Sequence, residues 1–218
     1  MKKTVLVSCL ALLAASPVFA ASAPEEGFYL GAAYGTAKLD DKAFRDQQPL
    51  SVDDKDSSLQ LWGGYRFTKW IAMEGRYATL GEYKAVIYDG DSGTTDSKIK
   101  ADSFTVNMKV ILPIGNSGFD VYGLLGLGIA NWDAEVGPVD PKPALSASDI
   151  EGAVTYGLGV RWTILPSLTV QLALDGNTYE GSTAVSYTDP DDEDSQITEA
   201  ISFDSNTLST TLGIQYNF

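Results

Sequence analysis

Apolar and polar residues alternate along eight stretches of this chain. The last stretch, residues 208–218, reads LSTTLGIQYNF, with apolar side chains at every second position from Leu212 to Phe218 and small or polar residues between them. A repeat of two predicts a β-strand with one apolar face. A terminal strand that finishes on aromatic residues suits a barrel closed in lipid, because chain ends in water otherwise fray.

The other seven stretches predict strands of the same kind, joined by connections that alternate in length. We expect these strands at residues 27–38, 58–67, 71–79, 99–112, 119–131, 152–164 and 168–179, and an extension of the third to residue 88 stays open. Polar connections at residues 39–57, 89–96, 132–150 and 180–206 alternate with short turns. Bacterial outer-membrane barrels have an even number of strands, short periplasmic turns and longer outside loops.

The two faces of these strands favour a membrane barrel over a soluble β-sandwich or a lipocalin-like barrel, which would bury its apolar face. The apolar face is uniformly large, whereas the opposite face mixes glycine, alanine, threonine and charged residues. Outward aromatic residues gather near both strand ends, as expected at the membrane–water boundaries: Phe28, Tyr65, Phe67, Trp162, Tyr216 and Phe218 near the short turns, and Tyr34, Tyr77, Phe104 and Tyr156 near the long loops. We predict an all-β fold, an eight-stranded antiparallel up-and-down transmembrane β-barrel with periplasmic termini.

The first twenty residues are typical of a secretory signal peptide. Lys2 and Lys3 precede a short apolar segment that ends at Ala20 with small residues at the cleavage positions. We therefore expect a signal peptide at residues 1–20 and a barrel domain at residues 21–218. An uncleaved anchor helix is the alternative, but the apolar run is too short to span a bilayer.

Composition excludes several classes of chemistry. Cys9, inside the expected signal, is the single cysteine, and the apolar segment before it is too short for a lipoprotein site. The chain has no histidine, and its net charge is −14, or −16 once Lys2 and Lys3 are removed. An acidic chain argues against a nucleic-acid surface. Enzymatic barrels depend on a catalytic histidine that accepts a proton near neutral pH, so we predict no enzyme activity, no catalytic residues and no cofactor.

Four segments carry a resemblance to a known family. The opening GFYLGAAYG, the hairpin GGYRFTKWIAMEGRY, the segment VYGLLGLGIA and the aromatic end are similar to the OmpA-like small outer-membrane barrels. The resemblance implies the fold, the outer-membrane location, and recognition of Leu212, Ile214, Tyr216 and Phe218 by the barrel assembly machinery, with periplasmic chaperones also expected during biogenesis. The chain stops at the eighth strand, so the family's peptidoglycan-binding domain, and wall anchoring with it, is not carried over.

Inward positions of the strands hold several charged residues. These are Arg66, Glu74, Arg76, Lys109 and Arg161, with Asp120 and Asp175 as further candidates. Because buried charge is costly unless paired, we predict a salt-bridged cluster centred on Glu74 with Arg161, Arg76 or Lys109. The resemblance agrees, since such barrels carry an interior glutamate at the position of Glu74. A cluster of this kind either plugs the interior or acts as a gate that switches partners.

The fourth long connection is strongly acidic. Asp189, Asp191, Asp192 and Asp194 offer oxygen ligands of the type Ca²⁺ prefers, but their spacing does not match an EF-hand loop. A solvated, self-repelling run of charge is the simpler interpretation.

These observations predict an integral outer-membrane protein with a structural or surface-interaction role: membrane integrity, or adhesion and recognition through the outside loops. A narrow passive channel for ions or small solutes is the alternative. The expected partners are outer-membrane lipid and lipopolysaccharide. The sequence does not identify an extracellular partner.

Overall fold

The structure, a computed structural model, describes residues 24–39, 51–53, 55–89, 93–137, 145–189 and 192–218. Its elements are β1 (Gly27–Leu39), β2 (Ser51–Asp53), β3 (Lys55–Arg66), β4 (Ile71–Asp89), β5 (Gly93–Pro113), β6 (Phe119–Val136), β7 (Leu145–Leu165), β8 (Leu168–Asp189) and β9 (Asp192–Asn217). Within this part of the chain there is no helix long and apolar enough to cross a membrane.

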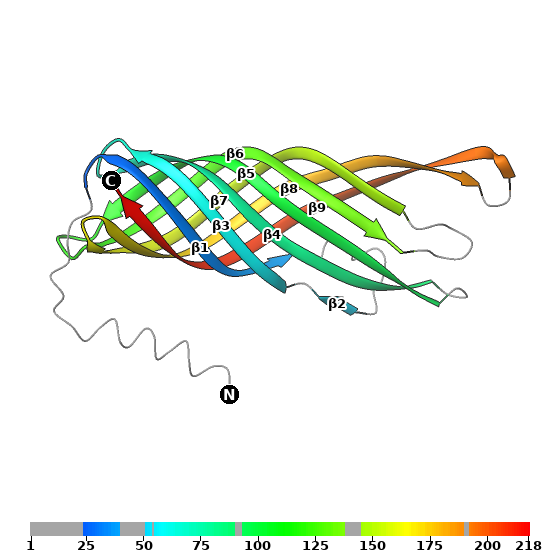
Figure 1. Ribbon diagram of the computed structural model, residues 1–218, viewed down its shortest axis with the longest axis horizontal. Helices are drawn as coiled ribbons and strands as arrows, with labels where there is room; N and C mark the ends of the chain where they lie inside the picture. The colour runs from blue at the N-terminus through cyan, green and yellow to red at the C-terminus, as the bar shows by residue number, and fades with distance from the viewer. Residues whose placement is uncertain (1–23, 40–50, 54, 90–92, 138–144, 190–191) are drawn as a thin grey trace, which may run out of the picture.

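Eight of these strands form a closed antiparallel barrel (Figure 1). Each pairs with the barrel strand that follows it in the chain, and β1 pairs with β9 from Tyr29 opposite Asn217 to Leu39 opposite Thr207. This last pairing closes the ring and leaves no strand edge inside the barrel wall. The prediction of an eight-stranded up-and-down barrel is confirmed. The short strand β2 was not expected, and it pairs with β4 outside the ring, with Val52 opposite Ala85.

The two ends of the barrel differ, and we name them by their connections. At the short-turn end the strands are joined by residues 67–70, 114–118 and 166–167, and the C-terminus lies there too (Figure 1). At the opposite, ribbon end, the hairpins β4–β5 and β8–β9 project beyond the ring (Figure 1).

Three of the expected long loops, at residues 89–96, 132–150 and 180–206, are strand over most of their described residues, which corrects the sequence-based boundaries. Most of residues 180–206, expected as an acidic loop, continues the pairing of β8 with β9, and β6 and β7 extend into the region expected as a loop at 132–150. Because water reaches both faces of a two-stranded ribbon, its strands need no apolar face. The alternation that predicts a strand from the sequence is therefore missing there.

Alternate side chains face opposite sides of the wall, as predicted. Large apolar residues such as Leu30, Leu127 and Leu212 are 59–68% exposed, as a lipid-facing surface requires. Near the short-turn end, outward aromatic rings contact one another: Phe28 lies 4.8 Å from Tyr65, and Tyr216 lies 5.0 Å from Phe218, between ring centroids. This confirms the girdle expected there.

The strand β4 changes course where it leaves the ring. The register with β5 shifts between Thr79 and Gly81, and Gly81 has φ of +105°, a conformation that residues with a Cβ rarely adopt. Leu80 continues the inward alternation of β4, and the bulge shifts that alternation so that Tyr83 points inward as well; both side chains are fully buried.

Candidate functional site

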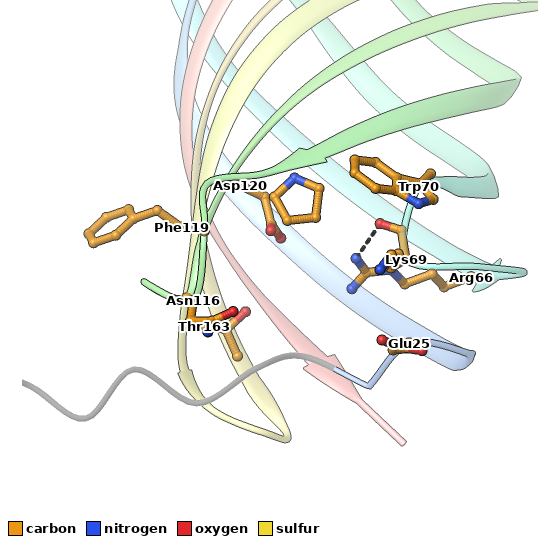
Figure 2. A pocket seen from close by; sticks show the side chains of 11 residues that line it. Glu25, Arg66, Lys69, Trp70, Asn116, Phe119, Asp120 and Thr163 are labelled. Carbon is orange, nitrogen blue, oxygen red and sulfur yellow. Dashed lines mark hydrogen bonds between the residues drawn. The ribbon is translucent and has the colours of Figure 1, made fainter.

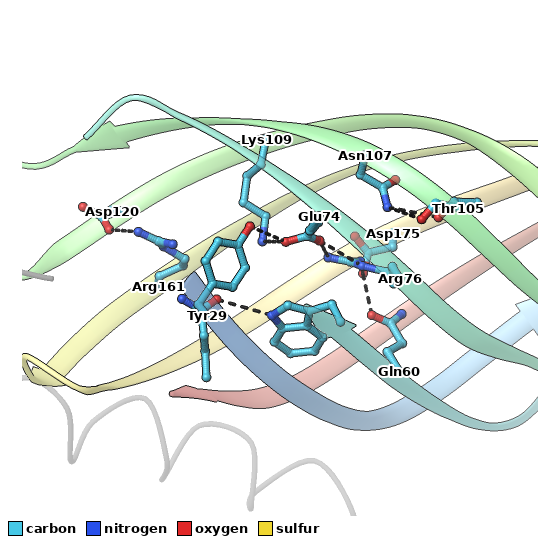
Figure 3. Close-up of polar contacts among 12 residues, drawn as sticks. Tyr29, Gln60, Glu74, Arg76, Thr105, Asn107, Lys109, Asp120, Arg161 and Asp175 are labelled. Carbon is cyan, nitrogen blue, oxygen red and sulfur yellow. Dashed lines mark hydrogen bonds and ion pairs between the residues drawn. The ribbon is translucent and has the colours of Figure 1, made fainter. Parts of the chain in front are cut away.

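The centre of the barrel holds four buried charged side chains, which we call the central network (Figure 3). It consists of Glu74 and Arg76 from β4, Lys109 from β5 and Asp175 from β8, each at most 2% exposed. Glu74 and Arg76 are two residues apart on one strand, so the pleat sends both side chains to the same inner face. The sequence predicted inward positions for Glu74, Arg76 and Lys109 and offered Asp175 as a further candidate.

The carboxylate of Glu74 is shared by two cations and a phenol. Its Oε1 accepts hydrogen bonds from Nη2 of Arg76 at 2.6 Å and from Nε at 3.1 Å. Its Oε2 lies 2.6 Å from Nζ of Lys109 and accepts a hydrogen bond from the hydroxyl of Tyr29 at 3.0 Å. Both carboxylate oxygens are thus occupied, which is the condition for keeping a buried anion ionised.

Arg76 links this carboxylate to a second one across the lumen. Its Nη1 lies 3.1 Å from Oδ2 of Asp175 and donates to Oε1 of Gln60 at 3.3 Å. Aromatic rings support the cations: the guanidinium of Arg76 lies 5.6 Å from the ring of Trp62, and Nζ of Lys109 lies 4.6 Å from the ring of Tyr122.

The central network is electrically balanced. Two carboxylates face one guanidinium and one ammonium, so its formal charge is zero. Removing water from a single charge costs several kcal/mol, and only good geometry with added hydrogen bonds offsets this. The arrangement can therefore hold β4, β5 and β8 in one register and occlude the lumen at this level. Tyr29 and Gln60 also bond to the central network, although sequence reasoning did not assign them a role. Their inward position in the alternation was the sequence signal that could have identified them.

Arg161, which was expected in the interior charge cluster as one of three alternative partners of Glu74, lies outside the central network. It pairs with Asp120 nearer the short-turn end (Figure 3). Asp120 and Arg161 stand directly opposite each other on β6 and β7, so the cross-strand register settles the choice of partner.

Arg66 is also absent from the central network. It lies at the end of β3 and donates three hydrogen bonds to backbone carbonyls, those of Thr68 at 3.2 Å, Lys69 at 2.7 Å and Pro24 at 3.2 Å. It lines an open pocket of about 310 Å³ at the short-turn end, together with Asp120 (Figure 2). Its position beside the turn explains this role, because the turn presents carbonyls that the ladder does not use.

A second, apolar layer fills the lumen toward the ribbon end. Leu80, Tyr83, Trp132 and Tyr179 are buried there and pack with smaller residues into one cluster. We name these four residues the apolar layer. Sequence reasoning missed it because residues 80–88 were left open and Trp132 was expected to begin a loop.

The other sequence-predicted sites are placed less completely. The four residues of the expected assembly signal lie on the outer face of β9 and at the chain end, 52–72% exposed: Leu212, Ile214, Tyr216 and Phe218. Of the acidic candidates for a metal, Asp191 lies outside the described residues, and for the other three the structure gives only the backbone. Over the described part of the chain, no group of three metal-binding side chains gathers that could hold an ion.

Comparison with known proteins agrees with this geometry. Outer membrane protein P5 of Haemophilus influenzae is 26% identical over 229 residues, covering 100% of this chain, which spans 61% of the length of that relative. The crystal structure of OprG from Pseudomonas aeruginosa superposes with a TM-score of 0.55 at 18% identity, over 90% of this chain and 98% of that one. Ail of Yersinia pestis, in complex with the heparin analogue sucrose octasulfate, gives 0.50 at 15% identity, over 89% and 100%.

In outer-membrane barrels generally, the short turns face the periplasm and the longer connections face outside. The family described as "Outer membrane protein beta-barrel domain" matches residues 6–218. This chain belongs to that family of outer-membrane β-barrels.

Proposed function

We propose that the protein is a closed barrel that contributes to outer-membrane integrity, presents its extracellular strands for recognition, and passes almost no solute. The observation that supports this most directly is the filling of the lumen. Two successive levels, the central network and the apolar layer, are built from side chains at most 2% exposed. An eight-stranded barrel has an interior just wide enough for side chains to fill.

The apolar layer is the stronger barrier to ions. An ion crossing it would leave water without finding compensating charge, at a cost of several kcal/mol or more. The central network could supply alternative charged partners to a passing ion, but no residue of the apolar layer carries a charge, and the Tyr83 hydroxyl already donates to the carbonyl of Leu80. Their burial beside Trp132 supports a sealed barrel rather than a conduit.

The test is conductance of the whole protein in planar bilayers, together with swelling of liposomes that contain it. Heat-modifiable migration in a detergent gel verifies folding first. We expect no solute-driven swelling and no steady conductance above that of protein-free bilayers. Swelling in small sugars at rates comparable to a general porin would refute the proposal.

A narrow, gated channel is the second candidate, and the sharing of Glu74 between two cations is the observation that favours it. A gate requires these ion pairs to exchange partners. Removing the anion with Glu74→Ala would then raise conductance several-fold over wild type. A conductance equal to wild type in a folded variant rules out the gate and leaves the sealed barrel.

Three partner assignments accompany this proposal. We propose that lipopolysaccharide surrounds the outer half of the barrel. The outward lysines toward the ribbon end suit anionic headgroups: Lys100 is exposed, and Lys84 and Lys98 keep exposed side chains although both contact Glu82. The assembly machinery and periplasmic chaperones would act on the exposed alternation from Leu212 to Phe218.

Residues 1–20 would direct export, and the absence of histidine supports a barrel without hydrolytic activity.

A further inference from the structure

The β8–β9 hairpin continues as a two-stranded ribbon far beyond the ring (Figure 1). β7 pairs with β8 no further than Ala153 opposite Tyr179, and β1 pairs with β9 no further than Leu39 opposite Thr207. The two strands nevertheless stay paired with each other from Glu180 opposite Asp204 to Thr188 opposite Gln196. We call residues 180–189 and 192–206 the distal ribbon.

Both outer edges of the distal ribbon carry backbone groups that pair with no other strand within the described residues. At about 3.3 Å per residue, the edge of β8 is about 33 Å long and that of β9 about 50 Å. Proteins usually protect exposed edges with lysine, proline or a bulge. The distal ribbon contains neither lysine nor proline, its register with the partner strand shifts only between Thr188 and Asp189, and residues 181–188 are uncharged. Such an edge is a template for an added strand.

The charge of the distal ribbon determines which kind of peptide strand can add to its edge. The distal ribbon has seven acidic residues, Glu180, Asp189, Asp192, Glu193, Asp194, Glu199 and Asp204, and no lysine, arginine or histidine. The whole chain after Arg161 is without basic residues. A second copy of the ribbon would bring an equal negative charge to the same edge, so self-pairing is opposed. A cationic strand is attracted along the entire length.

We propose that the distal ribbon binds an extended, lysine- or arginine-rich peptide segment by adding it as a third strand. The inference rests on the surface-recognition part of the proposed function and names its partner class. Backbone hydrogen bonds to the open edge supply the pairing, and the acidic residues supply steering and selectivity. The site lies on the hairpin that projects well beyond the ring, away from the short-turn end (Figure 1).

The experiment uses the full barrel in lipid nanodiscs and three probe peptides of equal length. The first alternates lysine with threonine or valine, the second replaces each lysine by glutamate, and the third alternates lysine with proline. The third keeps the charge but lacks the N–H groups that a sheet requires. Fluorescence anisotropy measures binding at low and high salt, and hydrogen exchange measures protection of amides in residues 180–189 and 192–206.

We expect the lysine peptide alone to bind and to slow exchange in the distal ribbon. The variant Glu180→Gln/Glu199→Gln/Asp204→Asn should weaken binding at low salt on the order of tenfold, an effect that high salt removes. Asp133→Asn/Glu135→Gln, which removes exposed acids from β6, is the control and should change affinity less than about twofold.

Equal binding of the lysine–proline peptide would overturn strand addition, since charge alone would then explain it. No binding by any probe, protection outside the distal ribbon, or self-association of the barrel would overturn the proposal as well. None of these outcomes affects the conductance measurements, so a failure here is distinguishable from a conducting barrel.

Discussion

Neutralising Glu74 should destabilise the barrel more than removing Glu74 and Lys109 together. The variant Glu74→Gln leaves two buried cations with one carboxylate. Arg76 keeps Asp175 at 3.1 Å, but Lys109, which is fully buried, loses the only carboxylate within salt-bridge distance among the described residues. Breaking a buried pair from one side costs about 3–5 kcal/mol, because the remaining charge is left uncompensated.

The double variant Glu74→Gln/Lys109→Met restores the balance, since the pair of Arg76 with Asp175 remains neutral by itself. Methionine keeps most of the volume of lysine, and the rings of Tyr29 and Tyr122 that flank Lys109 suit a thioether. We therefore expect the double variant to be about 2 kcal/mol or more stable than Glu74→Gln, a strong positive coupling for two neighbouring sites.

Reversible urea unfolding in lipid vesicles, followed by tryptophan fluorescence, measures these free energies. Glu82→Gln is the control, because Glu82 also contacts two lysines but at the surface, where ion pairs contribute little, and its urea midpoint should shift far less than that of Glu74→Gln. Two results would refute the reasoning: a loss below about 1 kcal/mol for Glu74→Gln, or a double variant whose loss equals the sum of the two single losses.

Two further predictions test packing and surface charge. Gly31→Ala should destabilise the barrel by about 1–3 kcal/mol, because its Cβ would enter the ring of Trp62, while Gly152→Ala, whose Cβ meets nothing, should leave the urea midpoint unchanged. Hydrogen bonds from Lys84 and Lys98 lower the pKa of Glu82, so these contacts add stability above the ordinary glutamate pKa of about 4.3 and lose it as pH falls through the lower folded value. Carboxyl NMR should show that titration below 4.3, and Lys98→Gln should move it upward; an unshifted titration contradicts the ion pairs.

The membrane-spanning part of the fold was predictable because lipid imposes a strict rule on it. Every strand there must expose an apolar side and bury the other, so alternation set the number, faces and approximate positions of the strands. The turn between Arg66 and Ile71 was equally clear. Outside the membrane this rule does not apply, because water reaches both faces of the strands. Residues 180–206 were therefore predicted as a loop, although backbone pairing continues through most of them.

The interior was predictable in its composition but not in its partners. Alternation identified Arg66, Glu74, Arg76, Lys109 and Arg161 as inward, and the structure gathers three of them. Which anion pairs with a given cation depends on the register between neighbouring strands. The alternation within a single strand does not reveal that register. The pair of Arg161 with Asp120 follows from register alone.

Charge is distributed unevenly between the inside and the outside of this barrel. The buried charged side chains in the described residues are four cations, Arg66, Arg76, Lys109 and Arg161, and three anions, Glu74, Asp120 and Asp175. The interior is thus close to neutral, while the chain as a whole carries −14. Neutrality inside is what stability demands, since unpaired buried charge is costly. Stability does not require seven acidic residues on the distal ribbon. Their mutual repulsion opposes the pairing of β8 with β9 there. A feature that works against local stability while directing an open strand edge outward is better explained by recognition than by folding.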